Sequence, residues 1–313
     1  MWRKIKKRLL ISSLIFSLTY FSVILFFYKS EFIRGIAEFN FGQIFLALIL
    51  VVSVWVIRFY KWNLCLNRLG IKISAKISAI IFLSGFSLNF TPGKIGDFVK
   101  ILLVDKFHKG NKKNIFFVIF LERLTEIFSL AFLLLLISLK HFNLIEANLM
   151  IVLFIAMFLL LLFNKKIYSY LILKIFNRSK NKIAGISKDE INSTLYQKLF
   201  DKVFLIKINL ITIISWILEG YSFYILFYKF VDCEFILIIG IYFLSILIGS
   251  VSMLPGGVFT TEAGLVFMLK KIGLKGFEFS PVIIISRFFT LWLPTLIGIF
   301  FLIMFKRKYG EIE

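Results

Sequence analysis

Six apolar runs, each long enough to cross a bilayer as an α-helix, dominate this sequence. A transmembrane helix needs about 20 mostly apolar residues, and the runs of this length are Leu9–Tyr28, Phe41–Tyr60, Ile115–Leu139, Leu144–Phe163, Ile208–Phe230 and Phe279–Phe305. The composition agrees, because 60% of the residues are hydrophobic and the mean hydropathy is +0.93. An ordinary soluble domain is excluded, and the sequence predicts an all-α polytopic membrane protein.

Two further apolar runs, Ile77–Phe90 and Phe235–Leu254, end at polar patches that break a helix. The first patch is Asn89–Asp97, with the sequence NFTPGKIGD, and the second is Met253–Glu262, with the sequence MLPGGVFTTE. Proline and glycine both disfavour a helix interior. Each run therefore either crosses the membrane or turns back at its patch.

The distribution of lysine and arginine favours turning back. Short cytoplasmic loops carry an excess of positive charge, but if both runs cross, the outer loops hold more Lys and Arg than the inner ones. If both runs turn back, the basic segments 1–8, 58–76, 94–113, 165–207 and 306–308 all lie in the cytoplasm. We therefore predict six full spans plus two re-entrant hairpins, or eight transmembrane helices if the hairpins are counted as spans. Both termini are expected in the cytoplasm.

This topology is an inverted repeat within a single integral membrane domain, residues 1–313. Residues 1–143 form the first repeat and residues 144–313 the second. Each half has three crossings, so the second half is inserted upside down, as in many transporters. Arg123 and Arg287 follow the prolines of their patches at nearly the same distance, which agrees with a repeat. The pairs Trp55-x-x-Arg58 and Trp216-x-x-Glu219 also correspond loosely.

The segment 164–207 is the one sizeable polar stretch and is strongly basic. It is expected to be a cytoplasmic linker resting on anionic headgroups, with an interfacial helix around Ile167–Phe176. The net charge of +21 is explained by such loops, so nucleic-acid binding is not expected. The first run, Leu9–Tyr28, lacks a small-x-small cleavage site and is expected to be a retained span.

The two patches predict an internal cavity that binds an anionic group. Irregular backbone within a membrane is tolerated where protein buries it or a cavity solvates it, and the first N–H groups of a restarting helix suit phosphate. The candidate headgroup-binding residues are Asn89, Thr91, Gly93, Lys94, Gly96, Arg123, Gly256, Gly257 and Arg287. The alternative is that the glycines only permit tight packing of the hairpins.

Carboxylates accompany these cations, and each charge within the membrane needs a partner or a polar cavity. The candidate counter-charges or proton carriers are Asp97, Glu122, Glu126, Glu219 and Glu262. Static ion pairs, such as Asp97 with Arg123 and Glu262 with Arg287, are the simpler alternative. The static ion pairs and the functional roles are compatible if a lipid headgroup displaces an ion pair that exists in the resting protein.

Catalytic and metal-binding patterns are weak by comparison. His108 and His141 are expected on opposite sides of the membrane and cannot share a metal ion. Cys65 and Cys233 form no CxxC pair or disulfide framework, and no nucleophile or phosphate-loop motif is present. No cofactor is expected, and a transporter is favoured over an enzyme.

Four motifs in order resemble the lysylphosphatidylglycerol synthase transmembrane-region family, which is also described as flippase-like. They are Asn89-x-x-Pro92-Gly93-x-x-Gly96-Asp97, Glu122-Arg123-x-x-Glu126, Pro255-Gly256-Gly257 with Glu262, and Arg287 with Trp292. The resemblance implies a multi-pass protein of a bacterial or archaeal inner (cytoplasmic) membrane that handles phospholipids or polyprenyl-phosphate-linked lipids. Glu126 stands where aspartate is common, and the segment 259–262 has fewer glycines than many relatives.

The expected function is that of a lipid flippase acting on lipids with anionic headgroups. In the two-part synthases of this family a soluble aminoacyl-transfer domain follows, and because this chain stops at Glu313, lysine transfer is not expected. Two alternatives stay open. One is an integral-membrane glycosyl- or aminoacyl-transferase, and the other is a scaffold subunit that holds envelope-lipid biosynthetic enzymes through the loop 164–207. The sequence does not indicate an oligomeric state.

Overall fold

The structure is a computed structural model, and every element in the part that it describes is helical. It describes residues 39–91, 97–110, 112–141, 152, 198–199, 201–228, 233–252, 254–273 and 280–310. Apart from Val152, the expected spans Leu9–Tyr28 and Leu144–Phe163 lie outside these residues, as does the expected interfacial helix Ile167–Phe176. The predicted all-α membrane architecture is confirmed, but the number of spans stays a prediction.

Three long helices have the length and hydropathy of membrane spans: α2 (Phe41–Arg68), α10 (Lys202–Phe227) and Pro281–Tyr309. A capping box at Asn40 begins α2, where the Asn40 side chain accepts from Gly42 N and the Gln43 side chain accepts from Asn40 N.

Within the last span, α13 (Ser280–Arg287) passes through a π-turn, η4 (Phe288–Trp292), into α14 (Leu293–Tyr309). A fourth long helix, α5 (Lys112–His141), contains the charged motif that begins at Glu122.

Two helix boundaries differ from the sequence-based expectation. Helix α2 continues past Tyr60 to Arg68, because Lys61 is buried and bonded to neighbouring helices. Helix α10 begins at Lys202, where Asp201 caps it by accepting from Phe204 N. The basic linker therefore ends before residue 202, not at 207.

The two helix breaks fall at the Pro-Gly patches. In the first half, α3 (Ala75–Gly85) and η1 (Phe86–Leu88) lead into the patch and α4 (Val99–Asp105) leaves it. In the second half, α11 (Phe235–Val251) leads into η3 (Pro255–Gly257), and α12 (Thr260–Lys271) follows. Gly256 and Gly257 both have φ of +63°, a conformation that glycine adopts without steric cost. The incoming helices are apolar but shorter than the spans.

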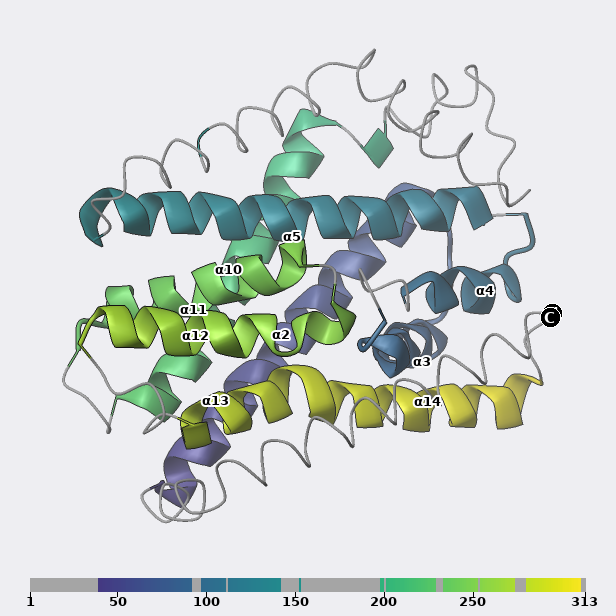
Figure 1. Cartoon of the computed structure of the whole chain (residues 1–313). Helices are drawn as coiled ribbons and strands as arrows, with labels where there is room; N and C mark the ends of the chain where they lie inside the picture. The colour runs from purple at the N-terminus through teal and green to yellow at the C-terminus, as the bar shows by residue number, and fades with distance from the viewer. Residues whose placement is uncertain are drawn as a thin grey trace.

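Each hairpin packs against the last long helix of the other half. Helix α3 and η1 contact α14, whereas α11 contacts α5. Helices α2 and α10 pack extensively against each other. Figure 1 shows α5 and α14 on opposite sides, with α3 and α4 toward one end and α11 and α12 toward the other. Because each hairpin packs against a helix of the other half, the two helix breaks lie together in the middle of the bundle.

Close packing of these helices depends on small residues. A Cβ added to Gly298 of α14 would lie 2.3 Å from Ser87 N and 2.6 Å from Phe86 C, which are backbone atoms of η1. A Cβ added to Gly249 of α11 would lie 2.0 Å from Thr261 Oγ1 on α12. Neither of these two glycines belongs to a Pro-Gly patch, so the alternative that the patch glycines only permit tight packing stays a prediction.

Candidate functional site

The tips of the two hairpins meet. Phe90 of the first tip forms a buried apolar cluster with Val258 of the second tip and Leu291 of η4. Trp292 packs against this cluster, with its ring centroid 5.0 Å from that of Phe90. A Cβ added to Gly256 would lie 3.1 Å from Leu291 Cδ1 and 3.5 Å from Phe90 Cδ1, so glycine allows the second tip to approach the first.

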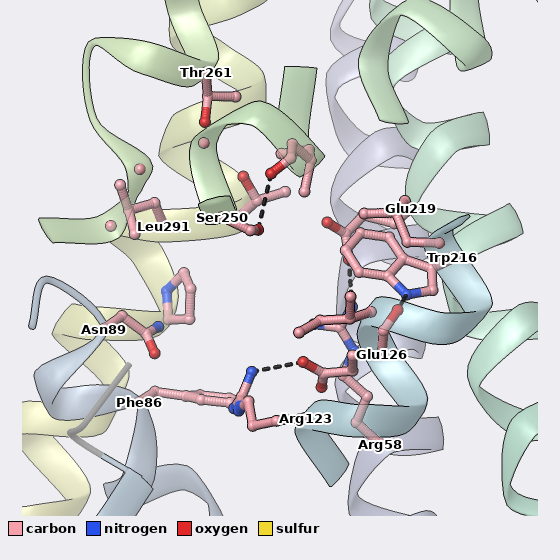
Figure 2. Close-up of a pocket in the computed structure, with 18 of the residues that line it drawn as sticks. Arg58, Phe86, Asn89, Arg123, Glu126, Trp216, Glu219, Ser250, Thr261 and Leu291 are labelled. Carbon is pink, nitrogen blue, oxygen red and sulfur yellow. Dashed lines mark hydrogen bonds and ion pairs between the residues drawn. The ribbon is translucent and has the colours of Figure 1, made fainter. Parts of the chain in front are cut away.

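A cavity of about 350 Å³ lies beside this contact. Both hairpins, α2, α5, α10 and the π-turn segment contribute to its wall. The polar and charged residues that line it are Arg58, Asn89, Thr91, Lys100, Glu122, Arg123, Glu126, Glu219, Ser250, Thr261, Arg287 and Thr290. Figure 2 shows Phe86, Asn89 and Leu291 on one side, with Trp216, Glu126 and Glu219 opposite.

Arg123 of α5 joins the cavity to a buried ion-pair network. Its guanidinium donates to Asp97 Oδ2 and to Glu126 Oε2, the latter at 2.5 Å. Lys100 Nζ lies 3.3 Å from Asp97 Oδ1 and 3.3 Å from Glu122 Oε2. Asp97, Lys100 and Glu122 are each at most 4% exposed. Burial of charge is tolerated here because each ion has an opposite charge within contact distance.

Aromatic rings complete the environment of Lys100. Its ammonium lies 4.9 Å from the ring centre of Trp62 and 5.0 Å from that of Phe82, in cation–π geometry. A Cβ added to Gly85 would lie 2.5 Å from Lys100 Cε. Glycine at position 85 thus makes room for the buried lysine.

The second half supplies a smaller network. Arg287 Nε donates to Glu262 Oε1 at 2.7 Å, and Arg287 Nη2 donates to the carbonyl of Gly256 at 2.7 Å. This arginine ties the tip of the second hairpin to the π-turn segment. A π-turn inside a helix is frequent at functional sites, and here it begins at the residue after Arg287.

A third pair joins the two halves. Arg58 Nη2 of α2 donates to Glu219 Oε2 of α10 at 2.8 Å, and Tyr242 OH donates to Glu219 Oε1 at 3.2 Å. The Arg58 guanidinium also lies 5.2 Å from the ring centre of Trp216. Trp216 Nε1 in turn donates to the backbone carbonyl of Glu126 at 3.1 Å, so this pair is connected to the Arg123 network.

Most of the sequence-predicted site residues come together. Asn89, Thr91, Arg123, Gly256, Gly257, Arg287, Glu122, Glu126 and Glu219 line the cavity. Asp97 and Glu262 form the two ion pairs that were predicted as resting contacts, with Arg123 and Arg287 respectively. Gly93, Lys94 and Gly96 lie outside the described residues. Whether these residues bind a headgroup stays a prediction.

Three further cations were missed: Arg58 and Lys100, which line the cavity, and Lys61, which is bonded to Thr125 and Thr212. The charge distribution placed Arg58, Lys61 and Lys100 in cytoplasmic loops, but their side chains are largely buried. Lys100 could have been found, because it follows Asp97 by one helical turn, a spacing that favours an ion pair. The loose Trp-x-x-charge correspondence also pointed to Arg58, which lies against Trp216 itself.

The cavity has an apolar side as well as a charged one. Ile127 and Leu130 of α5 and Ile246, Leu247 and Leu254 of the second hairpin line this side. Ile127 and Leu254 are 37% and 42% exposed, so this side of the cavity presents apolar surface that is not covered by protein. In the part of the chain that the structure describes, no group of three His, Cys, Asp or Glu could hold a metal ion. The site therefore combines one buried arginine, Arg287, and two partly buried ones, Arg58 and Arg123, with an apolar lining.

Long apolar helices around a buried cluster of ion pairs define an integral membrane protein with a polar internal site. Residues 9–298 match the lysylphosphatidylglycerol synthase TM region family, so the chain belongs to that family. The resemblance seen in the four sequence motifs is thereby confirmed.

Two archaeal relatives agree with this membership. A UPF0104 membrane protein of Pyrococcus horikoshii is 24% identical over 275 residues, which cover 79% of this chain and 81% of that protein. A UPF0104 membrane protein of Methanothermobacter thermautotrophicus is 30% identical over 95 residues, which cover 30% of this chain and 28% of that protein. Both are named as membrane proteins.

Proposed function

We propose that this protein is a flippase-like lipid translocator whose cavity binds the anionic headgroup of a phospholipid or a polyprenyl-phosphate-linked lipid. The observation that carries the proposal is the meeting of the hairpin tips beside a cavity lined by Arg58, Arg123 and Arg287. Guanidinium groups bind phosphate oxygens by paired, charge-assisted hydrogen bonds. Such groups inside a membrane are costly and generally mark a substrate path.

The apolar side of the cavity favours a lipid over a free anion. Ile127 and Leu254 leave apolar surface uncovered on this side of the cavity. An acyl or prenyl chain can occupy such a surface while the phosphate enters the charged part. This arrangement would let a headgroup cross without leaving its tail in water.

We also propose that the protein has the inverted-repeat architecture found in a class of transporters. The support for this architecture is the exchanged packing, in which α3 contacts α14 and α11 contacts α5, together with hairpins that approach each other from opposite ends (Figure 1). Movement of one repeat against the other would then expose the cavity alternately to the two sides. We place the protein in the cytoplasmic membrane of a prokaryote, with both termini in the cytoplasm, because that orientation keeps its basic loops inside.

Proteoliposomes with a fluorescent phosphatidylglycerol test this function. We expect the purified protein to accelerate exchange of that probe between leaflets, and to act less on a phosphatidylcholine probe of the same chain length. Arg287→Ala should slow phosphatidylglycerol exchange about tenfold, because loss of a charge-assisted hydrogen bond costs about 1.5 kcal/mol or more.

Arg307→Ala provides the matched control, because Arg307 lies at the exposed end of α14. It should exchange lipid at the wild-type rate. Wild-type protein that leaves both probes at the rate of protein-free vesicles would rule out translocation of this lipid class.

A further inference from the structure

The resting partner of Arg123 on the cavity side is a carboxylate. Asp97 also contacts Lys100, which is itself 2% exposed. Glu126 lines the cavity and holds Arg123 Nη1 at 2.5 Å, and Figure 2 shows this pair facing the open space. A phosphate oxygen that approaches Arg123 Nη1 from the cavity therefore competes with the Glu126 carboxylate for this guanidinium.

The displaced carboxylate would remain among buried charges. The backbone carbonyl of Glu126 is held by Trp216 Nε1, so the residue cannot simply leave the site. The titratable and charged groups around it come from each neighbouring element: Arg58 and Lys61 on α2, Asp97 and Lys100 in the first hairpin, Glu122 and Arg123 on α5, Glu219 on α10, Tyr242 and Glu262 in the second hairpin, and Arg287 on α13.

Two of the nearby cations already pair with carboxylates, and a third is bonded to hydroxyl groups. Arg58 is bound to Glu219, and Lys100 to Asp97 and Glu122. Lys61 lies 3.4 Å from Thr125 Oγ1 and 3.1 Å from Thr212 Oγ1. A displaced, ionised Glu126 would thus lie near the incoming phosphate in a cavity that Glu122 and Glu219 also line. Two like charges in close contact inside a protein favour protonation of one of them.

We infer that Glu126 is a proton-binding site and that the protein moves one proton together with each anionic headgroup. When the phosphate oxygen replaces Glu126 on Arg123, the Glu126 carboxylate takes one proton from water. When the headgroup leaves, the carboxylate returns that proton to water and binds Arg123 again. The protein would therefore be a proton–lipid symporter, an activity that rests on the proposed lipid function and adds a driving force to it.

Equilibrium binding of radiolabelled phosphatidylglycerol to the purified full-length protein in detergent tests this inference. If binding takes up one proton, affinity rises about tenfold for each unit of pH decrease over the range in which Glu126 is ionised in the lipid-free protein and protonated in the complex. Proton uptake upon mixing, followed with a pH indicator in weak buffer, should approach one per lipid bound. Inorganic phosphate in a parallel titration distinguishes a lipid headgroup site from a site for the free anion.

Glu126→Gln isolates the proposed residue. The amide has the size of the protonated acid and can still accept from Arg123, so binding should persist, become independent of pH and take up no proton. Glu126→Asp keeps the titrating group and should keep the pH dependence. Glu234→Gln, at an exposed position before α11, should behave as the wild type.

The possible failures are distinguishable. If wild-type protein binds phosphatidylglycerol without pH dependence or proton uptake, the symport inference is wrong while the lipid site stands. The same holds if Glu126→Gln retains the wild-type pH dependence. Absence of phosphatidylglycerol binding at every pH would instead overturn the proposed function itself.

Discussion

Arg123→Ala is expected to reduce phosphatidylglycerol exchange in proteoliposomes by about 100-fold or more. The substitution removes the group proposed to bind phosphate and leaves Asp97 and Glu126 without their shared guanidinium. Removing one partner of a buried ion pair costs about 3–5 kcal/mol, and about 2.7 kcal/mol corresponds to a factor of 100. Arg123→Lys should retain part of the activity, because an ammonium keeps the charge but cannot bridge two acceptors as a planar fork does.

Arg68→Ala is the matched control for this substitution. Arg68 Nη2 lies 3.4 Å from Asp201 Oδ2, and the two side chains are 44% and 41% exposed. Exposed pairs contribute about 1 kcal/mol or less, so exchange should stay near the wild-type rate. If Arg123→Ala elutes as a monodisperse protein and exchanges lipid as the wild type does, Arg123 has no part in binding the headgroup.

Gly298→Ala is expected to lower thermal stability strongly and to abolish lipid exchange. The new Cβ would overlap the backbone of η1 at Ser87 and Phe86, and backbone cannot rotate away as a side chain can. Overpacking of this kind costs about 1–3 kcal/mol. Relief requires α14 to move away from the first hairpin, which would separate the tips and open the site.

Gly42→Ala tests whether replacing any helical glycine lowers thermal stability as Gly298→Ala is expected to do. A Cβ at this position in the first turn of α2 meets only Asn40 Oδ1, at 3.8 Å. Alanine is favoured over glycine in a helix by about 0.5–1 kcal/mol, so this variant should melt at or above the wild-type temperature. Equal melting temperatures for Gly298→Ala and the wild type would mean that α14 does not contact the first hairpin as described.

The helix breaks and most of the charged site could be predicted from the sequence because they rest on local signals. Pro-Gly pairs inside apolar runs mark where α11 ends and where the chain leaves η1. Intramembrane arginines predict carboxylate partners, and the pairs of Arg123 with Asp97 and of Arg287 with Glu262 are present. The cost of burying an unpaired charge makes such pairs predictable without a structure.

The burial of Arg58 and Lys61 could not be predicted in the same way. A positive charge beside an apolar run is compatible with a cytoplasmic loop or with a buried ion pair, and the choice depends on residues distant in sequence. Glu219 accepts from Arg58 across 161 positions of the chain, and Thr212 accepts from Lys61 across 151. Only the packing of α10 against α2 brings these partners together.

Photocrosslinking from a photoreactive amino acid at position 89 tests whether an anionic headgroup binds where the hairpin tips meet. Asn89 lines the cavity at the first tip, whereas Phe267 on α12 is 67% exposed and provides the control position. We predict that position 89 crosslinks phosphatidylglycerol in preference to phosphatidylcholine and that Arg123→Ala abolishes this preference, while position 267 crosslinks both lipids equally. Equal crosslinking of the two lipids at position 89, unchanged by Arg123→Ala, would mean that no anionic headgroup is recognised where the hairpin tips meet.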